Sequence, residues 1–399
     1  MLNISAILAA KQRLEPVVFK TPLVDHSAFF PFQLYSKLEN LQKTGAFKIR
    51  GAYNKIAQLS EEEKNKGIIC ASAGNHAQGV AYSAKLLGID ATVVMPRYAP
   101  LAKIEASREY RVKVILHGDS FEEAYAYAQQ LQKENSQIFI EPYNDYEVIA
   151  GQATIALEIL EKLEAFDYIL VPIGGGGLLA GIAYTIKQFK PDVKVIGIEA
   201  ANASTMYESI HHDKIIAADK VDTFADGIAV RQVGQIPFKI CKTTVDQVIT
   251  VNETEINKAV LFALEKFHLV VEGAGAVGLA ALLADKLHLK PQDKVVNIIS
   301  GGNIDITLLT TLIDRGLRQC DRKITFGTRI QDKPGSLNKL LELLAEKQAN
   351  IITVNHDRYH HNTSAMTCYV EITIDTFDAI HQADIFETLR LKNYDYRIK

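Results

Sequence analysis

The sequence has little excess charge and no long uninterrupted apolar stretch. Its 44 basic and 47 acidic residues give a formal net charge of −3, which does not indicate a nucleic-acid or anionic-membrane partner. Charges or glycines break every apolar run before it reaches membrane-spanning length, so we expect no membrane span. Residues 1–16 read as an amphipathic helix and not as a signal peptide.

Cysteine is also scarce. The four cysteines lie far apart and form no paired motif: Cys70, Cys241, Cys320 and Cys368. Such spacing is typical of free thiols in a reducing compartment. The chain has 399 residues, of which 48% are hydrophobic, enough for two or three globular domains. We therefore expect a cytoplasmic globular protein.

Alternation of apolar runs and helical stretches dominates the chain from residue 67. The runs that predict strands are apolar on both faces and cover residues 67–73, 91–96, 112–118, 137–142, 167–173, 193–200 and 293–300. Strands of this kind, separated by helices, indicate parallel sheet covered on both faces. The predicted fold class is α/β, and the number of strands allows more than one sheet.

The pattern changes near residue 322. Residues 323–330, 350–356 and 365–374 predict strands, and those at 323–330 and 365–374 alternate apolar and polar residues, with one face left to solvent. A helix with leucines at positions 337, 340, 341 and 344 follows the first strand, and a second helix ends the chain. We predict a separate small α+β domain of order βαββα over residues 323–399.

Three glycine-rich turns follow predicted strands, at residues 174–177, 273–278 and 300–303. A turn of this kind that enters a helix presents backbone N–H groups at the positive end of the helix dipole, which suits a phosphate. The first turn also fits G-x-G-x-x-A through Gly175, Gly177 and Ala180, and Glu199 ends the next strand where a ribose-binding acid would stand. A nucleotide-dependent oxidoreductase is therefore one alternative. For residues 273–278, close helix packing is the favoured interpretation.

Lys48, in the segment TGAFKIRG, has two interpretations from the residues alone. It is either a solvated helix lysine or a pocket lysine whose lowered pKa frees its amine for catalysis. Four segments in order, LENLQKTGAFKIRGA, SAGNHAQG, PIGGGGL and SGGN, resemble the threonine dehydratases (threonine ammonia-lyases), which use pyridoxal 5′-phosphate. This resemblance covers about residues 5–320 and favours the second interpretation.

The resemblance implies a fold, a cofactor and a reaction. The catalytic domain, residues 1–320, would have the tryptophan-synthase-β-like architecture of two lobes, with the smaller lobe, roughly residues 50–150, inserted in the larger. The cofactor would be pyridoxal 5′-phosphate. The reaction would be α,β-elimination from L-threonine to 2-oxobutanoate and ammonia, and from L-serine to pyruvate and ammonia.

Site residues follow from matching positions in the four segments. Lys48 would be the Schiff-base lysine and the base, Phe47 would flank the cofactor ring, and Asn75 would bond the ring hydroxyl. Ser300 would face the pyridine nitrogen. The phosphate would lie in the loop of Gly174, Gly175, Gly176 and Gly177, and the substrate carboxylate in the loop of Ser72, Ala73, Gly74 and His76. Ala46 stands where this family often has serine.

Three further alternatives remain open. They are a serine racemase, a 3-hydroxyaspartate ammonia-lyase and a non-catalytic amino-acid sensor. Serine racemases carry a proton-donating serine where this chain has Ala73, so racemisation should be weak. Racemases also bind a divalent ion, and Glu199 and Ala203 match two of its ligands, but Thr205 replaces a carboxylate. These residues define no metal site, and a monovalent ion near Glu199 is one hypothesis. The histidines at 211–212 and 360–361 read as solvated loop residues.

Residues 323–399 resemble an ACT domain, a small amino-acid-sensing fold. The turn DKPGSL matches the loop that holds an effector in such domains, which implies an effector site at Asp332, Pro334 and Gly335. The resemblance implies allosteric control by an amino acid, and pairing of two such domains in a homo-oligomer, a dimer or tetramer. A dimerising domain that has lost its ligand is the alternative.

Overall fold

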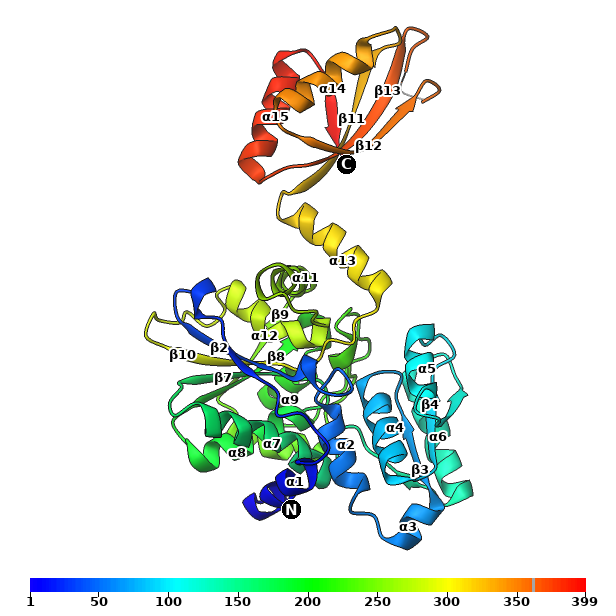
Figure 1. Cartoon of the computed structure of the whole chain (residues 1–399), viewed down its shortest axis with the longest axis vertical. Helices are drawn as coiled ribbons and strands as arrows, with labels where there is room; N and C mark the ends of the chain where they lie inside the picture. The colour runs from blue at the N-terminus through cyan, green and yellow to red at the C-terminus, as the bar shows by residue number, and fades with distance from the viewer. Residues whose placement is uncertain (361–362) are drawn as a thin grey trace. The chain divides into compact units, whose positions relative to one another are not determined.

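A computed structural model describes residues 1–360 and 363–399 of the chain, and His361 lies outside the described residues. Contacts divide it into two units, Met1–Ile306 and Thr307–Lys399 (Figure 1). This boundary lies earlier than the one predicted from the sequence, which was after residue 320. Helix α13 (Ile306–Gln319) joins the second unit because Arg318 bonds Thr325 and Asp314 pairs with Lys323 at the start of the next strand.

The larger lobe of the first unit is built on a six-stranded sheet of order β1-β2-β10-β7-β8-β9. Five strands are parallel, and the short edge strand β1 is antiparallel to β2. The central strands are apolar because both of their faces are covered. The bounds are β1 (Leu23–Asp25), β2 (Gln33–Leu38), β7 (Tyr168–Pro172), β8 (Lys194–Ala200), β9 (Gln247–Val251) and β10 (Lys294–Ile299).

Helices cover this sheet on both faces. Figure 1 shows α7 and α8 on one side and α11 and α12 on the other. Among the described residues, no helix is both long and apolar enough to cross a membrane. The bounds are α1 (Ile4–Leu14), α7 (Tyr146–Lys162), α8 (Gly177–Phe189), α9 (Thr205–His211), α10 (Gln235–Thr244), α11 (Glu253–Phe262) and α12 (Gly273–Leu283).

The smaller lobe carries a second parallel sheet, of order β5-β4-β3-β6. Its strands are β3 (Ile68–Ala71), β4 (Ala91–Met95), β5 (Lys113–Leu116) and β6 (Ile138–Phe139), and its helices are α3 (Glu61–Lys66), α4 (Asn75–Leu87), α5 (Leu101–Arg108) and α6 (Phe121–Asn135). Helix α2 (Lys48–Ile56) packs against both α4 and α7. The prediction of an α/β fold with two parallel sheets is confirmed.

The second unit contains a four-stranded antiparallel sheet of order β12-β13-β11-β14. Its elements are β11 (Lys323–Gln331), α14 (Ser336–Glu346), β12 (Asn350–Asp357), β13 (Thr367–Asp375), α15 (Ala379–Leu391) and β14 (Tyr396–Ile398). Alternate residues of β13 are buried, as the period-2 pattern predicted. Strand β14 was not predicted from the sequence, because three residues are too few to show a period.

A buried ion network joins helix α2 to the larger lobe. The guanidinium of Arg50 is fully buried and donates to Glu39 through Nε and Nη2, each at 2.8 Å, and to Glu158 through Nη1 at 2.6 Å. Lys37 Nζ donates to the second oxygen of Glu158 at 2.5 Å. Burial alone would lower the pKa of Arg50, but its two carboxylate partners raise it. Each buried charge is thus paired, as an apolar interior requires.

Arg50→Met tests this network. The substitution leaves the two carboxylates of Glu39 and Glu158 buried beside the single positive charge of Lys37, so we expect the free energy of unfolding to fall by about 3–5 kcal/mol. Urea denaturation measures the loss. The control is Lys66→Met, which removes a cation from the exposed pair with Glu62 and should hardly change stability. Equal effects of the two substitutions would contradict the role given to Arg50.

Candidate active site

A cavity of about 1010 Å³ lies in the first unit and reaches both of its lobes. Its wall includes Ala71 at the end of β3, Pro172 at the end of β7 and Ser300 just after β10. Ligands of open parallel sheets bind beyond the carboxyl ends of strands in this way. The cavity brings together every residue expected to hold the cofactor or the substrate: Phe47, Lys48, Ser72, Ala73, Gly74, Asn75, His76, Gly174, Gly175, Gly176, Gly177 and Ser300.

Lys48 is the first residue of helix α2 and lies in the cavity wall. Its Nζ donates a hydrogen bond to the carbonyl oxygen of Pro142 at 3.0 Å and stands 5.2 Å from the centre of the Phe47 ring. Burial lowers the pKa of Lys48 to about 8, and the negative charge of Glu272 acts in the opposite direction. The amine is therefore partly neutral near pH 8, and a neutral amine is a nucleophile and a base.

The glycine loop connects β7 to the N-terminus of α8, a helix of 13 residues. Gly176 has φ +90° and caps this helix. A Cβ at Gly176 would lie 2.7 Å from Met206 Cε, and one at Gly175 would lie 2.3 Å from the ring of Tyr143. Larger residues are therefore excluded, and the loop can offer backbone N–H groups at a helix N-terminus to a phosphate.

Asn75 belongs to a hydrogen-bonded group that spans the cavity wall. Its Nδ2 donates to Glu272 Oε1 at 2.7 Å, and its Oδ1 accepts from Asn303 Nδ2 at 2.8 Å. Asn303 also donates to the carbonyl oxygen of Thr44, four residues before Lys48. The SGGN segment thus holds both Asn75 and the segment before Lys48, which gives its asparagine a role in positioning the site.

Glu272 is a cavity residue that the sequence analysis missed. Burial raises its pKa to about 7, Asp226 adds to this effect, and the hydrogen bond from Asn75 opposes it. Glu272 directly precedes α12, which begins with the glycine-rich segment 273–278, for which helix packing was the favoured interpretation. A Cβ at Gly301 would lie 2.4 Å from Glu272 Oε1, so the glycine leaves room for the carboxylate. An acid directly before a glycine-rich helix start was the available signal.

The loop of residues 72–76 lines the cavity and offers uncharged hydrogen-bond donors. Ser72 Oγ accepts a hydrogen bond from the backbone N–H of Gly74 at 3.1 Å. His76 Nε2 lies 2.9 Å from the carbonyl oxygen of Ile140, and burial lowers its pKa to about 3, with Lys48 acting in the same direction. His76 is therefore neutral at physiological pH. A substrate carboxylate in this loop would meet backbone N–H groups and Ser72, without a histidine cation.

Ser300 links strand β10 to helix α2. Its side chain is almost fully buried, and its carbonyl oxygen accepts from the backbone N–H of Phe47 at 3.1 Å. The next residue, Gly301, forms an isolated antiparallel bridge with Ala46. Because Ala46 is fully buried against this segment, the methyl group in place of a serine hydroxyl leaves no unsatisfied donor there.

Glu199 has a structural partner away from the cavity lining. Its two carboxylate oxygens accept from the backbone N–H groups of Met206 and Tyr207, both at 2.8 Å, at the start of α9. Burial raises its pKa to about 8. This arrangement does not favour a ribose-binding acid or the oxidoreductase alternative. The ion expected near Glu199 and Ala203 stays a prediction.

The expected loop histidines lie at a helix end. Histidines 211 and 212 each place Nδ1 at 2.9 Å from a backbone carbonyl oxygen four residues earlier, those of Tyr207 and Glu208. His211 ends α9, and His212 caps it. They are therefore local helix-end residues and not part of the cavity.

Comparison with known proteins agrees with this geometry. The family model described as pyridoxal-phosphate dependent enzyme matches residues 14–301. The L-threonine ammonia-lyase of Thermotoga maritima is 45% identical over 401 residues, covering 100% of both chains. The catabolic L-threonine dehydratase TdcB of Escherichia coli K12 is 44% identical over 77% of this chain and 95% of its own.

Comparison with solved structures also finds enzymes of this kind. Threonine deaminase isoform 2 of Solanum lycopersicum, in its processed form, superposes with a TM-score of 0.75 at 37% identity, covering 78% of this chain and 86% of its own. Maize serine racemase also reaches a TM-score of 0.75, at 36% identity, covering 80% of this chain and 98% of its own.

The lowered pKa of Lys48 can be measured by acylation of the protein across pH, with mass spectrometry of each lysine peptide. Only a neutral amine reacts, so labelling of Lys48 should rise through pH 8, its pKa being about 8. Lys66 is the internal control, because its hydrogen bond to Glu62 raises its pKa above 10.5. In Glu272→Gln the Lys48 profile should move to lower pH, since a negative charge that raises its pKa is lost. A Lys48 profile that coincides with that of Lys66 would contradict this account.

Proposed function

The chain belongs to the family of pyridoxal-phosphate dependent enzymes, and we propose that it is an ammonia-lyase that converts L-threonine to 2-oxobutanoate and ammonia. L-serine, one methyl group smaller, would give pyruvate by the same route. The observation that carries the proposal is Lys48, a cavity lysine with a pKa of about 8 that shares its cavity with the glycine loop. The full-length relative named L-threonine ammonia-lyase supports the substrate.

The cavity residues fit pyridoxal phosphate. The loop of Gly174–Gly177 is a cradle that a Cβ would fill, and it would hold the phosphate through backbone N–H groups. Lys48 would hold the cofactor covalently through Nζ, Asn75 would bond the ring hydroxyl, and Ser300 would face the ring nitrogen. When bound, the cofactor supplies an electron sink that makes the Cα–H bond of an amino acid acidic.

The chain itself supplies the proton transfer. With a pKa of about 8, Lys48 Nζ can accept the Cα proton near neutral pH once its amine is free. Ser300, whose hydroxyl is uncharged, does not force the ring nitrogen to stay protonated as a carboxylate would. We infer that this choice favours elimination over transamination. The backbone N–H groups and hydroxyl of residues 72–74 orient the substrate carboxylate.

Two ion pairs lie where the lobes meet over the cavity. Lys103 of α5 pairs with Asp226, and Glu122 of α6 lies 3.8 Å from Arg231. All four residues line the cavity. By holding the smaller lobe against residues 226–231 of the larger, these pairs would exclude water from the reaction, which strengthens electrostatic interactions inside the cavity.

The serine racemase alternative is less well supported by the cavity. Ala73 lines the cavity wall and has no group that can donate a proton to the second face of a substrate. A racemase needs such a donor, because inversion adds a proton on the face opposite to the one that loses it. The 3-hydroxyaspartate alternative differs only in the substrate side chain and is decided by assay.

The assay for this function supplies L-threonine, L-serine or 3-hydroxyaspartate to the cofactor-loaded protein and measures oxo acid, ammonia and D-serine. We expect 2-oxobutanoate from L-threonine, and we expect Lys48→Ala to reduce turnover by at least about 1,000-fold, since the base is lost. Lys66→Ala, which removes an exposed lysine outside the cavity lining, should retain most activity. Absence of ammonia release from every hydroxy amino acid would refute the proposal.

The second unit, we further propose, binds an amino-acid effector at the turn of Asp332, Pro334 and Gly335, as ACT domains do. Gly335 has φ +86° and caps α14, so the turn presents the N-terminus of an eleven-residue helix. A carboxylate is favoured at such a terminus. Ile352 and Val354 of edge strand β12 are 41% and 38% exposed, which suits pairing with a second copy in a homo-oligomer.

We propose that the protein acts in the cytoplasm. All four cysteines are free thiols, and Cys70, Cys241 and Cys368 are buried. Free thiols persist in a reducing compartment. A small-molecule amino acid is the partner that the family and its relatives support, and the effector would be a second one.

Gly335→Asp tests the effector turn, and Gly335→Asn is the matched control of equal size without the charge. Both place a side chain in open space at the same positive φ, which asparagine tolerates. Threonine cleavage is titrated with branched-chain and hydroxy amino acids. We expect the aspartate variant to lose most of the response, a coupling of about 5- to 150-fold in affinity, and the asparagine variant to retain more of it. Equal responses in both variants would exclude a carboxylate at this turn.

A further inference from the structure

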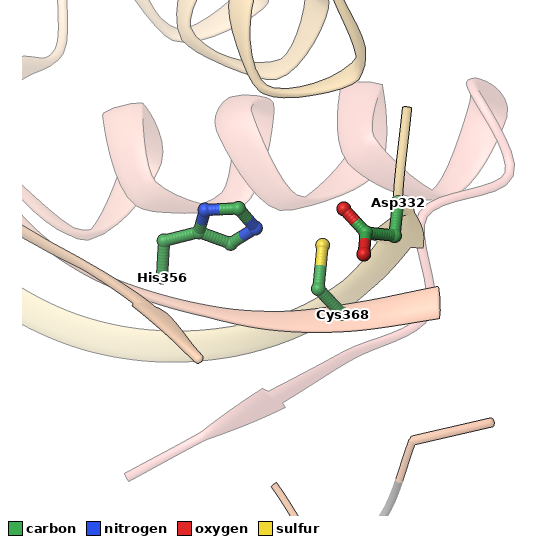
Figure 2. A group of neighbouring side chains, drawn as sticks. All are labelled: Asp332, His356 and Cys368. Atoms are coloured by element: carbon green, nitrogen blue, oxygen red, sulfur yellow. The ribbon is translucent and has the colours of Figure 1, made fainter. Parts of the chain in front are cut away.

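Three side chains with metal-binding chemistry meet at one end of the sheet in the second unit. They are Asp332, just after β11, His356 on β12 and Cys368 on β13, and one ligand atom from each lies within 4.8 Å of the others. Figure 2 shows the imidazole of His356 and the carboxylate of Asp332 on either side of the Cys368 sulfur. None of these residues belongs to the cavity of the first unit.

Strand register explains why the three meet. Cys368 pairs with Ile330 on β11, and His356 pairs with Val370, two residues further along β13. Residues two apart on a strand share a face, so His356 and Cys368 are diagonal neighbours within reach of each other. Asp332 lies two residues beyond Ile330 and approaches from the third strand. The cluster is therefore specified by the fold.

The donor atoms are largely uncommitted. Arg358 contacts only one oxygen of Asp332, Oδ1, at 3.1 Å from Nε and 3.0 Å from Nη2. Within residues 1–360 and 363–399, neither Asp332 Oδ2 nor the His356 ring has a hydrogen-bond partner. Cys368 Sγ makes one long contact, 3.8 Å, with the carbonyl oxygen of Ile330. One carboxylate oxygen, one imidazole and one thiol thus remain for a ligand.

We propose that Asp332, His356 and Cys368 bind a divalent transition-metal ion of the Zn²⁺ class. Sulfur, imidazole and carboxylate are the three ligand types that Zn²⁺ takes in proteins, whereas Mg²⁺ and Ca²⁺ require oxygen ligands. Binding displaces the thiol proton of Cys368 to solvent, since the thiolate is the ligand. Arg358 keeps its hydrogen bonds to Oδ1 and orients the carboxylate from outside the coordination sphere.

The proposed ion would join β11, β12 and β13, the three longest strands of this sheet. Three protein ligands leave a fourth tetrahedral position for water or another small ligand. The cluster goes beyond the lyase proposal and does not depend on it, because its residues lie wholly in the second unit. Asp332 also belongs to the proposed effector turn, so the two ideas are separated by titrating the metal alone.

The test uses full-length protein treated with a chelator and then titrated with Co²⁺ or Zn²⁺, without any amino acid. We expect one strong Co²⁺ site per chain with a thiolate-to-metal charge-transfer absorption. Cys368→Ser should abolish that absorption. Cys320→Ser, which removes the exposed cysteine outside the cluster, should leave it intact. The absorption persisting in Cys368→Ser, or no saturable site in the wild type, would overturn the proposal.

Because Cys368 lies in the core, the exposed His356 provides a second variant that leaves the packing intact. His356→Ala should weaken Zn²⁺ binding, measured by calorimetry, by at least about tenfold. Zn²⁺ should also raise the melting temperature of the wild type, since it binds the folded state, and raise that of His356→Ala much less. Equal affinity and equal thermal shift in the two proteins would overturn the assignment.

Discussion

The burial of two positively charged side chains on one short helix is the constraint on which the rest of the structure depends. Lys48 and Arg50 lie two residues apart at the start of α2. The carboxylates of Glu39 and Glu158 surround Arg50 and raise its pKa. Lys48 Nζ, by contrast, donates to a carbonyl oxygen, and burial lowers its pKa to about 8. Burial lowers the pKa of a cation, and nearby carboxylates oppose this effect, which they outweigh at Arg50. One helix thus anchors itself through Arg50 and delivers a reactive amine through Lys48.

The segments around this helix serve its placement. The carbonyl oxygen of Ser300 accepts from the N–H of Phe47, and Asn303 donates to the carbonyl oxygen of Thr44, so the SGGN segment holds the residues just before Lys48 at two points. Asn303 also holds Asn75, which in turn holds Glu272. A family motif that reads as a cofactor-binding sequence is therefore also a positioning device. The SGGN segment therefore positions both the amine of Lys48 and the side chains of the cavity wall.

Much of the fold could be predicted because burial leaves a clear trace in a sequence. Strands such as Ile68–Ala71 are apolar throughout, and the leucines of α14 repeat at helical spacing. Four ordered motifs predicted the cavity residues, which the fold brings together. Strand β14 and the place of α13 could not be predicted, because short strands and helix docking depend on partners remote in sequence.

Glu272 and Glu199 show a second limit. Both are buried acids near glycine-rich segments, and sequence spacing assigned a ligand to Glu199 and none to Glu272. In the structure, Glu199 accepts hydrogen bonds from the N-terminus of α9, and Glu272 lies beside Asn75 in the cavity. What a carboxylate does is decided by the groups that face it, here the backbone of a helix start for Glu199 and the side chain of a residue remote in sequence for Glu272. The cluster of Asp332, His356 and Cys368 escaped sequence analysis for the same reason, since three strands contribute one residue each.

The central claim is that the amine of Lys48 carries the cofactor. Borohydride reduction of the cofactor-loaded protein, followed by protease digestion and mass spectrometry, identifies the lysine to which pyridoxal phosphate was attached. Two lysines line the cavity, Lys48 and Lys103, so the experiment distinguishes the buried amine from the one paired with Asp226. The account predicts the reduced adduct on the peptide that contains Lys48. An adduct on Lys103, or no covalent adduct in a cofactor-loaded preparation, would contradict it.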